Sequence, residues 1–382
     1  MGDQSSIEWT DASWMPVRGC VRVSPGCVNC YAERMAATRL AHTDAYRGLA
    51  AMTKDGPRWT GEVRLSPGEL DQPIRWTRPR KIFVCSMADL FHKDVPDDYL
   101  DKVFAAAALA PQHVFQILTK RAERLPEYFN AEGRRGAVCS DGVAALGYDG
   151  EAQEAAYANV EAGGGWPPQN VWVGVSAEDQ DNAVRRIALL TQTKAQVRWV
   201  SAEPLLGPVD LSPWLWGPKT LGLGGVPRSG LLHWVVAGGE SGPGSRPMHP
   251  AWAKLLRDQC QDAGVAYFFK QWGAWTPEVP NGAPYTSLAL FNQNENGDKP
   301  ILIKNLEADR RADWTEGQAD DTLMFHANKK ATGRVLEGRT WDEYPAMKCI
   351  HCAQPAQPGT TLCGPACLSQ WQADRREAAR AD

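Results

Sequence analysis

The sequence predicts an α/β fold in which parallel strands form a TIM-like βα barrel, partial or complete, followed by a small C-terminal zinc knuckle. Apolar runs of strand length alternate with helix-patterned stretches over residues 1–275, an order that favours βα units and a parallel sheet. The runs are uninterrupted and rich in β-branched and aromatic residues, which is typical of strands buried on both faces. Two groups of cysteines lie near the two ends of the chain.

A short first strand is predicted within residues 7–18, and a helix over 31–40 follows the first cysteine group. Apolar runs then predict six further strands, at residues 82–85, 114–118, 171–175, 197–200, 234–237 and 265–269. Helical patterns between them predict helices at 97–110, 180–190 and 250–263, with a shorter one near 122–130.

Two segments interrupt this alternation. Residues 131–169 are rich in Gly and Ala, and residues 217–230 are rich in Gly and Pro. Both exceed the usual length of a connection, so we expect surface insertions and consider them as lids. Beyond residue 275 the pattern weakens into polar loops. We therefore predict a barrel domain at 1–275, an extension of it at 276–345, and a knuckle with a terminal helix at 346–382.

Composition narrows the class of protein. Hydrophobic residues make up 43% of the 382 residues and charged residues 23%, as in an ordinary globular protein. The net charge of −4 excludes a global positive field, so nucleic acid could bind only at local basic patches. No apolar run approaches the roughly 20 residues of a membrane span, and the first thirty residues lack a signal-peptide core. These features predict a cytoplasmic protein with no membrane partner.

The first cysteine group comprises Cys20, Cys27 and Cys30, spaced C-x6-C-x2-C in a loop that contains Gly and Pro. Structural zinc sites and cubane iron–sulfur clusters usually take four protein ligands. Three thiolates leave one coordination position open, which suits a catalytic site. Cys85, Cys139 and Cys260 are scattered, and we expect them to be small buried apolar side chains.

The second cysteine group has the spacing C-x2-C-x10-C-x3-C and comprises Cys349, Cys352, Cys363 and Cys367. Two thiol pairs around a loop containing Gly and Pro predict a zinc site of the treble-clef kind. A module of this size cannot hold a core without its metal. Contact with a partner and fastening of the tail both remain open as its role.

Polar residues follow the predicted strands one after another. In a βα barrel these positions line the active site. Any one of them could be a helix N-cap, but together they indicate a functional site. They are Ser86, Asp89, Thr119, Lys120, Arg121, Ser176, Glu178, Ser201, Glu203, Glu240, Ser241, Lys270 and Gln271.

The first cysteine loop, with Cys30-Tyr31-Ala32 at its end, resembles the cluster loop of the radical S-adenosylmethionine (radical SAM) superfamily. The usual spacing there is C-x3-C-x2-C with an aromatic residue before the last cysteine, whereas Asn29 stands here. A closer resemblance, over about residues 7–345, is to a phage and bacterial family with a three-cysteine motif and no established function. The segments that carry it are 86–92, 118–121, 174–176, 201–205, 238–242 and 269–273.

The radical SAM resemblance implies a 4Fe–4S cluster on Cys20, Cys27 and Cys30. The fourth iron would bind S-adenosylmethionine, and an electron donor would drive its cleavage to a 5′-deoxyadenosyl radical. Ser86 and Asp89 are expected near the methionine amine. The other implied cofactor contacts are Ser176 and Glu178 for the ribose hydroxyls, and Ser201, Gly238 and Gly239.

Four charged residues are the catalytic candidates: Lys120, Glu203, Glu240 and Lys270. The lysines suit an anionic substrate or the cofactor carboxylate, or else each pairs with Glu203 or Glu240. The loop at 238–242 presents backbone N–H groups to a phosphate or makes a tight turn.

Basic clusters at 75–81, 120–121, 134–135 and 185–186 could follow a phosphate backbone. With the phage occurrence, the appended knuckle and a distant similarity to radical SAM lyases that repair DNA photoproducts, they point toward a nucleic-acid or nucleotide substrate. The net charge points away from it. One alternative is a non-enzymatic zinc-binding phage protein that contacts nucleic acid or a host protein. Another is an iron–sulfur enzyme whose cluster only transfers electrons.

Overall fold

The computed structural model describes residues 4–215, 231–278, 287–291, 300–304, 322–327 and 329–347, together with residues 349, 352, 354–357, 359–364, 366, 367, 369, 370 and 373. The insertion predicted at 217–230 and most of the terminal helix predicted after the knuckle lie outside these residues. None of the helices that can be described is long and apolar enough to cross a membrane.

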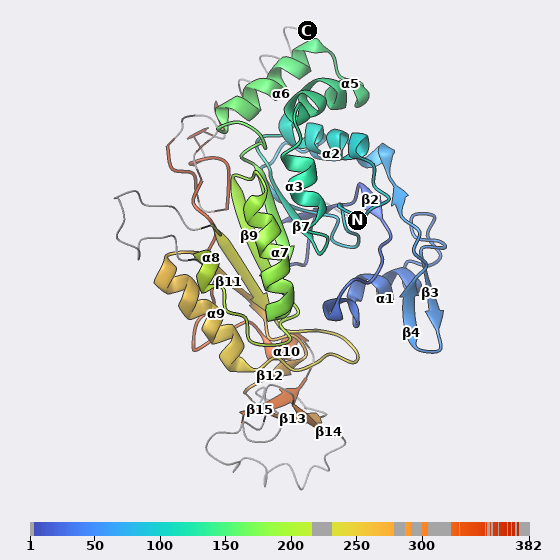
Figure 1. Ribbon diagram of the computed structural model, residues 1–382, viewed down its shortest axis with the longest axis vertical. Helices are drawn as coiled ribbons and strands as arrows, with labels where there is room; N and C mark the ends of the chain where they lie inside the picture. Colours follow the sequence, from blue (N-terminus) through green and yellow to red (C-terminus); the bar gives the residue numbers. More distant parts are fainter. Residues whose placement is uncertain are drawn as a thin grey trace.

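A curled sheet of seven parallel strands forms a half-barrel, in the order β1-β6-β7-β8-β9-β10-β11 (Figure 1). The prediction of parallel βα units is confirmed, and the barrel is a partial one. The strands are β1 (Ala12–Trp14), β6 (Lys81–Val84), β7 (Val114–Thr119), β8 (Val171–Ser176), β9 (Val197–Ala202), β10 (Trp234–Gly238) and β11 (Ala266–Gln271).

Helices cover one face of this sheet, which we call the outer face (Figure 1). The Asp179 side chain caps α7 by accepting from the Asn182 N–H at 2.9 Å, and Gly264 ends α9 with a φ of +66°. The helices are α1 (Tyr31–Ala37), α2 (Asp97–Leu109), α3 (Arg124–Phe129), α7 (Gln180–Gln192), α8 (Ser212–Leu215), α9 (Pro250–Ala263) and α10 (Lys329–Thr332).

The inner face of the half-barrel carries the alternate strand residues. In β8, Val171, Val173 and Val175 pack with the helices, whereas Trp172 joins a second cluster built around tryptophans. Gly174 lies on this inner face, where a Cβ atom would be 2.4 Å from the Trp199 ring. Only glycine therefore lets that indole lie flat across β8.

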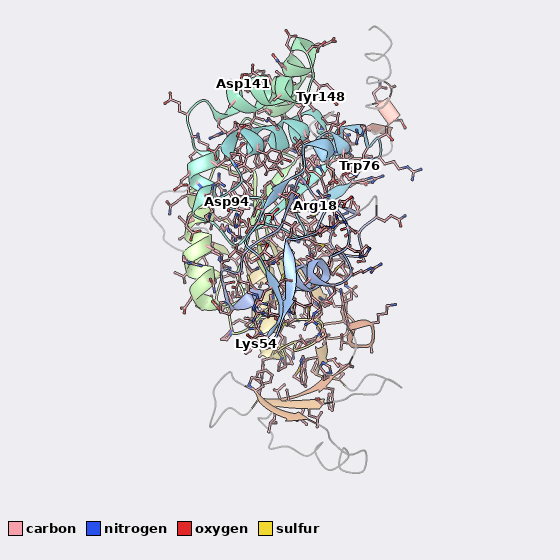
Figure 2. All side chains as sticks on the ribbon, turned by 90° about the vertical axis from the view of Figure 1, so that its right-hand side faces the viewer. Arg18, Lys54, Trp76, Asp94, Asp141 and Tyr148 are labelled. Carbon is pink, nitrogen blue, oxygen red and sulfur yellow. The ribbon has the colours of Figure 1, made fainter. Side chains whose placement is uncertain are left out.

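Residues 131–169, predicted as a surface insertion, form a helical layer on α2. The layer contains α4 (Arg134–Gly136), the π-helix η4 (Ala137–Gly142), α5 (Val143–Ala145) and α6 (Gly150–Ala162). Cys139 and Val160 are fully buried in it, and Gly142 lies so close to α2 that a Cβ would be 2.7 Å from the Asp101 carbonyl oxygen. Figures 1 and 2 place this layer far from α1 and from Lys54, which lies between β3 (Ala50–Thr53) and β4 (Gly56–Trp59), so it is no lid over the cysteine loop.

Smaller sheets complete the fold. An antiparallel sheet, in the order β12-β15-β13-β14, stands where polar loops were predicted. Its strands are β12 (Trp275–Thr276), β13 (Ser287–Phe291), β14 (Ile301–Lys304) and β15 (Thr322–His326). The N-terminal part adds β2 (Val17–Arg18), β3 (Ala50–Thr53), β4 (Gly56–Trp59), β5 (Arg64–Leu65) and the 3₁₀ turns η1 (Pro25–Cys27), η2 (Pro67–Glu69) and η3 (Gln72–Arg75).

Candidate functional site

The first cysteine loop crosses the carboxyl edge of the sheet between β2 and α1. Cys20, Cys27 and Cys30 are all partly exposed and form no disulfide. The loop is held to α1 by an ion pair between Arg22 and the buried Glu33, which also accepts from the Trp59 N–H at 2.8 Å. These contacts fix both ends of the loop while leaving its thiols available.

The three thiols are neighbours but are not gathered around one point. Burial raises the pKa of Cys20 to about 12, with Asp89 adding to the rise and Arg121 opposing it. Burial also raises the pKa of Cys30, which lies within electrostatic reach of both Cys20 and Cys27. Among the described residues, however, only the C-terminal cysteines bring three or more ligand atoms within 4.8 Å of one another. The arrangement of these three thiols therefore does not match a single zinc ion with its Zn–S bonds of about 2.3 Å.

Asp89 anchors the cysteine loop to the sheet. Its carboxylate accepts from the Phe91 N–H at 3.0 Å, the Thr119 hydroxyl at 2.7 Å and the Lys120 N–H at 3.1 Å. Arg121 donates to the same carboxylate at 2.8 Å and to the Val21 carbonyl oxygen at 2.9 Å. With four protein donors already bound, Asp89 positions the loop, and its predicted contact with the cofactor amine would have to displace one of them.

Replacement of Asp89 by asparagine is expected to destabilise the protein by about 2 kcal/mol, because the nearly buried Arg121 loses its countercharge. The same change should loosen the loop around Cys20. Urea unfolding measures the first effect, and the iron content after reconstitution measures the second. Asp94, an exposed carboxylate five residues on, provides the control as Asp94→Asn. Equal stability of the two variants would contradict the anchoring role.

Glu178 lies beneath the cysteine loop and is fully buried. It accepts from Arg186 at 2.8 Å, and Gly26 of the loop lies so close that a Cβ there would be 3.1 Å from the Glu178 carboxyl carbon. Burial alone would raise the pKa of Glu178, but the charges of Lys120 and Arg186, with the nearby Ser24 hydroxyl, outweigh it and lower that pKa to about 2. The carboxylate is therefore ionised at any physiological pH.

Glu203 and Glu240 each have a cationic partner. Lys270 donates to both Glu203 oxygens, at 2.7 and 2.8 Å, which is the pairing considered above as the alternative to a contact with an anionic ligand. Glu240 is bound by Arg246 through its Nε at 2.9 Å and by Asn29 of the cysteine loop at 2.9 Å. Asn29 therefore joins the loop to β10 from the position where radical SAM loops usually have an aromatic residue.

Lys120 differs from the other cations of the site. Its charge lowers the pKa values of Cys30 and Glu178 against the effect of burial, so its ammonium lies near both. Within the described part of the chain, that ammonium makes no hydrogen bond and no ion pair. Lys120 is thus a half-buried cation available to an anionic group of a ligand.

The remaining predicted cofactor contacts are mostly enclosed. Ser176 and Ser201 are almost fully buried, and the Ser86 carbonyl oxygen accepts from the Tyr31 hydroxyl. Gly239 donates its N–H to the Gln271 carbonyl oxygen at 2.9 Å, and a Cβ there would be 2.0 Å from the Trp272 carbonyl oxygen. These contacts favour the tight-turn alternative over a phosphate loop at Gly239. Gly238 has room for a Cβ at 3.4 Å from the Glu203 carboxyl group.

Most of the basic clusters predicted as nucleic-acid contacts are engaged in ion pairs. The acidic partners are Asp71 for Arg75, Asp97 and Asp101 for Arg134, Glu161 for Arg135, and Glu178 for Arg186. Arg186 is fully buried, so it cannot contact a phosphate backbone. Asn29, Arg186 and Arg246 belong to the site but carry no sequence motif that predicted them as parts of it.

The second cysteine group forms a compact site. The Sγ atoms of Cys352, Cys363 and Cys367 lie 3.1–3.6 Å apart, and all four sulfurs, including that of Cys349, lie within 4.8 Å of one another. Four sulfurs on a tetrahedron with bonds of about 2.3 Å would be about 3.8 Å apart. This group could therefore hold a metal ion with little movement. The scattered Cys85, Cys139 and Cys260 are buried, as predicted.

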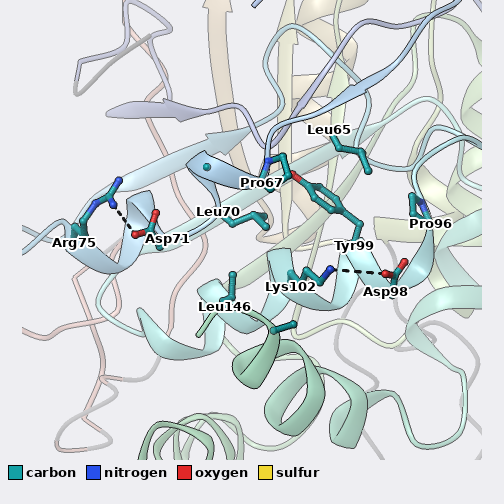
Figure 3. A pocket seen from close by; sticks show the side chains of 12 residues that line it. Leu65, Pro67, Leu70, Asp71, Arg75, Pro96, Asp98, Tyr99, Lys102 and Leu146 are labelled. Carbon is teal, nitrogen blue, oxygen red and sulfur yellow. Dashed lines mark hydrogen bonds and ion pairs between the residues drawn. The ribbon is translucent and has the colours of Figure 1, made fainter. Parts of the chain in front are cut away.

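A surface cleft of about 560 Å³ lies elsewhere, between α2 and the segment that contains β5, η2 and η3 (Figure 3). Its charged side chains pair with each other as Arg75 with Asp71 and Lys102 with Asp98. No cysteine lines this cleft. The predicted catalytic and cofactor-binding residues do not line it either.

Comparisons with known proteins found one family. A family model described as "Protein of unknown function (DUF5131)" matches residues 4–345. No curated protein and no solved structure matched the chain. The match includes the half-barrel and the first cysteine group, and it ends before the second cysteine group.

Proposed function

We propose that this chain, which belongs to the DUF5131 family, is an iron–sulfur enzyme of the radical SAM type. The observation that carries the proposal is the place of the three-cysteine loop. It follows the first strands and lies at the carboxyl edge of a curled parallel sheet, where βα enzymes have their active sites. A metal site with a purely structural role would not have to lie at the carboxyl edge of the sheet.

The donor set supports a cluster with one open iron. Cys20, Cys27 and Cys30 would hold three irons, and their spacing is wider than a single ion requires. The chemistry that such a group supplies is one-electron reductive cleavage of S-adenosylmethionine, which generates a 5′-deoxyadenosyl radical that takes a hydrogen atom from the substrate. An external electron donor is required.

Other residues of the chain position the cysteine loop and place charged groups beside it. The Asp89–Arg121 pair and the Asn29–Glu240 hydrogen bond hold the loop at both ends. Lys120 offers a positive charge beside Cys30 and is the best candidate in the site for binding the cofactor carboxylate. The Lys270–Glu203 pair joins the ends of β11 and β9 across the intervening β10 and is the candidate for orienting the substrate.

Replacement of Lys120 by methionine should weaken S-adenosylmethionine binding roughly 10- to 100-fold, because one ionic hydrogen bond is worth roughly 1.5–3 kcal/mol. The free energy of unfolding should change by less than about 0.5 kcal/mol, since this ammonium has no protein partner. Equilibrium dialysis with the reconstituted protein measures the affinity. Lys120→Arg keeps the charge and should retain most of the binding. An unchanged affinity in Lys120→Met would exclude this role.

The proposal itself is tested by anaerobic purification and reconstitution with iron and sulfide. We expect a brown protein that converts S-adenosylmethionine to 5′-deoxyadenosine when dithionite is added. A brown protein that leaves S-adenosylmethionine intact would favour the alternative in which the cluster only transfers electrons. A colourless protein with zinc in both cysteine groups would favour the non-enzymatic alternative.

A nucleic acid or nucleotide remains our proposed substrate class, although most of the predicted basic clusters are paired. Addition of DNA, RNA and nucleotides to the reconstituted enzyme, with 5′-deoxyadenosine formation as the readout, distinguishes these substrates. For the second cysteine group we infer zinc as the ion, because four thiolates in a tetrahedral set suit Zn²⁺.

A further inference from the structure

The segment after α10 returns to the half-barrel along its free edge. The Phe269 N–H donates to the Trp341 carbonyl oxygen at 3.0 Å, and the Glu343 N–H donates to the Tyr267 carbonyl oxygen at 3.2 Å. Phe268 forms an antiparallel bridge with Asp342. The chain is thereby paired with β11 just before it enters the second cysteine group.

Beyond this edge the chain packs on the tryptophan cluster of the inner face. Tyr344 stacks on Trp234 with ring centroids 5.3 Å apart, and the Trp234 indole N–H donates to the Glu343 carbonyl oxygen at 2.8 Å. The Trp172 indole N–H points at the Met347 sulfur, 3.2 Å away. Both tryptophans stand at or next to the start of their strands, so this packing closes the amino-terminal end of the half-barrel, opposite the first cysteine loop.

The second cysteine group is part of the same packing. We use the name "knuckle" for the described residues from Met347 to Cys367. Its buried members in the tryptophan cluster are Met347, Cys349, Ala356 and Leu362. Thr361, also fully buried, donates to the Gln112 carbonyl oxygen at 3.0 Å, immediately before β7. Cys349 is thus both a metal-ligand candidate and a core residue.

The described residues of the knuckle make few backbone hydrogen bonds with one another. Its described backbone hydrogen bonds include Cys349 N–H to the Gln354 carbonyl oxygen and Ala356 N–H to the Met347 carbonyl oxygen, both at 2.7 Å. A module of about twenty residues cannot bury enough apolar surface to order itself. A metal ion that joins its four thiols would supply the missing constraint.

We propose that zinc bound by Cys349, Cys352, Cys363 and Cys367 latches the knuckle onto the tryptophan-lined inner face and so closes the amino-terminal end of the half-barrel. The knuckle lies beyond the family match, which ends at residue 345. The knuckle is thus an addition to the family domain, and it packs on the tryptophan cluster at the amino-terminal end of the half-barrel. This role is independent of any chemistry at the first cysteine group.

The test uses the full chain in a Cys20→Ala/Cys27→Ala/Cys30→Ala background, so that zinc can be counted at one site. Cys352 is the exposed ligand, and Cys352→Ser removes a thiolate without removing core packing. Gln354→Ala, at another exposed position of the knuckle, is the matched control. Metal analysis gives the zinc content, and hydrogen exchange of peptides covering 170–173, 234–238 and 344–347 reports on the latch.

We expect one zinc per chain in the background and in Gln354→Ala, and none in Cys352→Ser. Loss of zinc should speed amide exchange in these peptides roughly tenfold, since their protection depends on the packing that zinc stabilises. Chelation of zinc from the background protein should give the same change, and added zinc should reverse it. Zinc retained in Cys352→Ser would overturn the site. Zinc lost without faster exchange would overturn the latch. Neither readout involves S-adenosylmethionine, so failure here is distinct from failure of the proposed enzyme activity.

Discussion

Replacement of Cys27 by alanine is expected to abolish cluster binding and the cleavage of S-adenosylmethionine while leaving the fold intact. Cys27 ends the η1 turn, is partly exposed, and has its sulfur 3.8 Å from the Ser24 hydroxyl oxygen. No core packing depends on this side chain, so the free energy of unfolding should change by less than about 0.5 kcal/mol. The iron and sulfide content after reconstitution should fall to background, and 5′-deoxyadenosine should not form.

The neighbouring Val28 provides the control. Its side chain is 49% exposed and offers no metal ligand, so Val28→Ala should keep both iron and activity. If Cys27→Ala still bound a full cluster and cleaved S-adenosylmethionine, the three-cysteine proposal would be wrong. If Val28→Ala lost the cluster too, the measurement would report damage to the loop instead of loss of a ligand.

The sheet could be predicted because most of its strands are continuous runs of apolar residues. Buried parallel strands read as continuous apolar runs, and β7, β8 and β10 begin at the predicted residues. The ends were set too early because β8 and β9 continue into Ser176 and Ala202, and polar or small residues do not signal a strand. The short first strand predicted within residues 7–18 is β1, but its bounds are set by its pairing with β6, which no local pattern reveals.

Other elements depend on distant partners. Residues 131–169 read as a loop because of their glycines, but their small residues let the helices pack closely on the alanine-rich α2. The strands β12 to β15 pair with one another, and short strands of this kind have a weak signal in the local sequence.

The candidate site likewise has one part that the local sequence predicts and one part that depends on contacts between distant segments. Cysteine spacing is a local signal, and it predicted both cysteine groups. The partners of the charged residues are not local: Asn29 and Glu240 are 211 residues apart in sequence, and Asp89 and Arg121 are 32 apart. Asn29 departs from the radical SAM pattern, and its hydrogen bonds explain why. Its side chain donates to Glu240 and, at 2.7 Å, to the Gly244 carbonyl oxygen.

Glu178→Gln is expected to cost about 3–5 kcal/mol of stability at neutral pH, because it leaves the fully buried Arg186 without its countercharge. The pH dependence follows from the same pair. The pKa of Glu178 in the folded protein is about 2, below its ordinary value of 4.5, so its ionisation stabilises the folded state by about 3 kcal/mol above pH 4.5. This contribution is lost as the pH falls from about 4.5 toward 2. Urea unfolding of the two proteins at pH 7 and pH 3 measures the difference.

The variant should therefore differ most from the parent protein at pH 7 and progressively less as the pH approaches 3. The double variant Glu178→Gln/Arg186→Met separates loss of the pair from loss of one charge. Since neutral side chains of similar size often replace a buried ion pair at small cost, the double variant should be more stable than Glu178→Gln alone. A deficit that is the same at both pH values, or a double variant that is less stable than the single one, would show that the Glu178–Arg186 ion pair does not stabilise the fold beneath the cysteine loop.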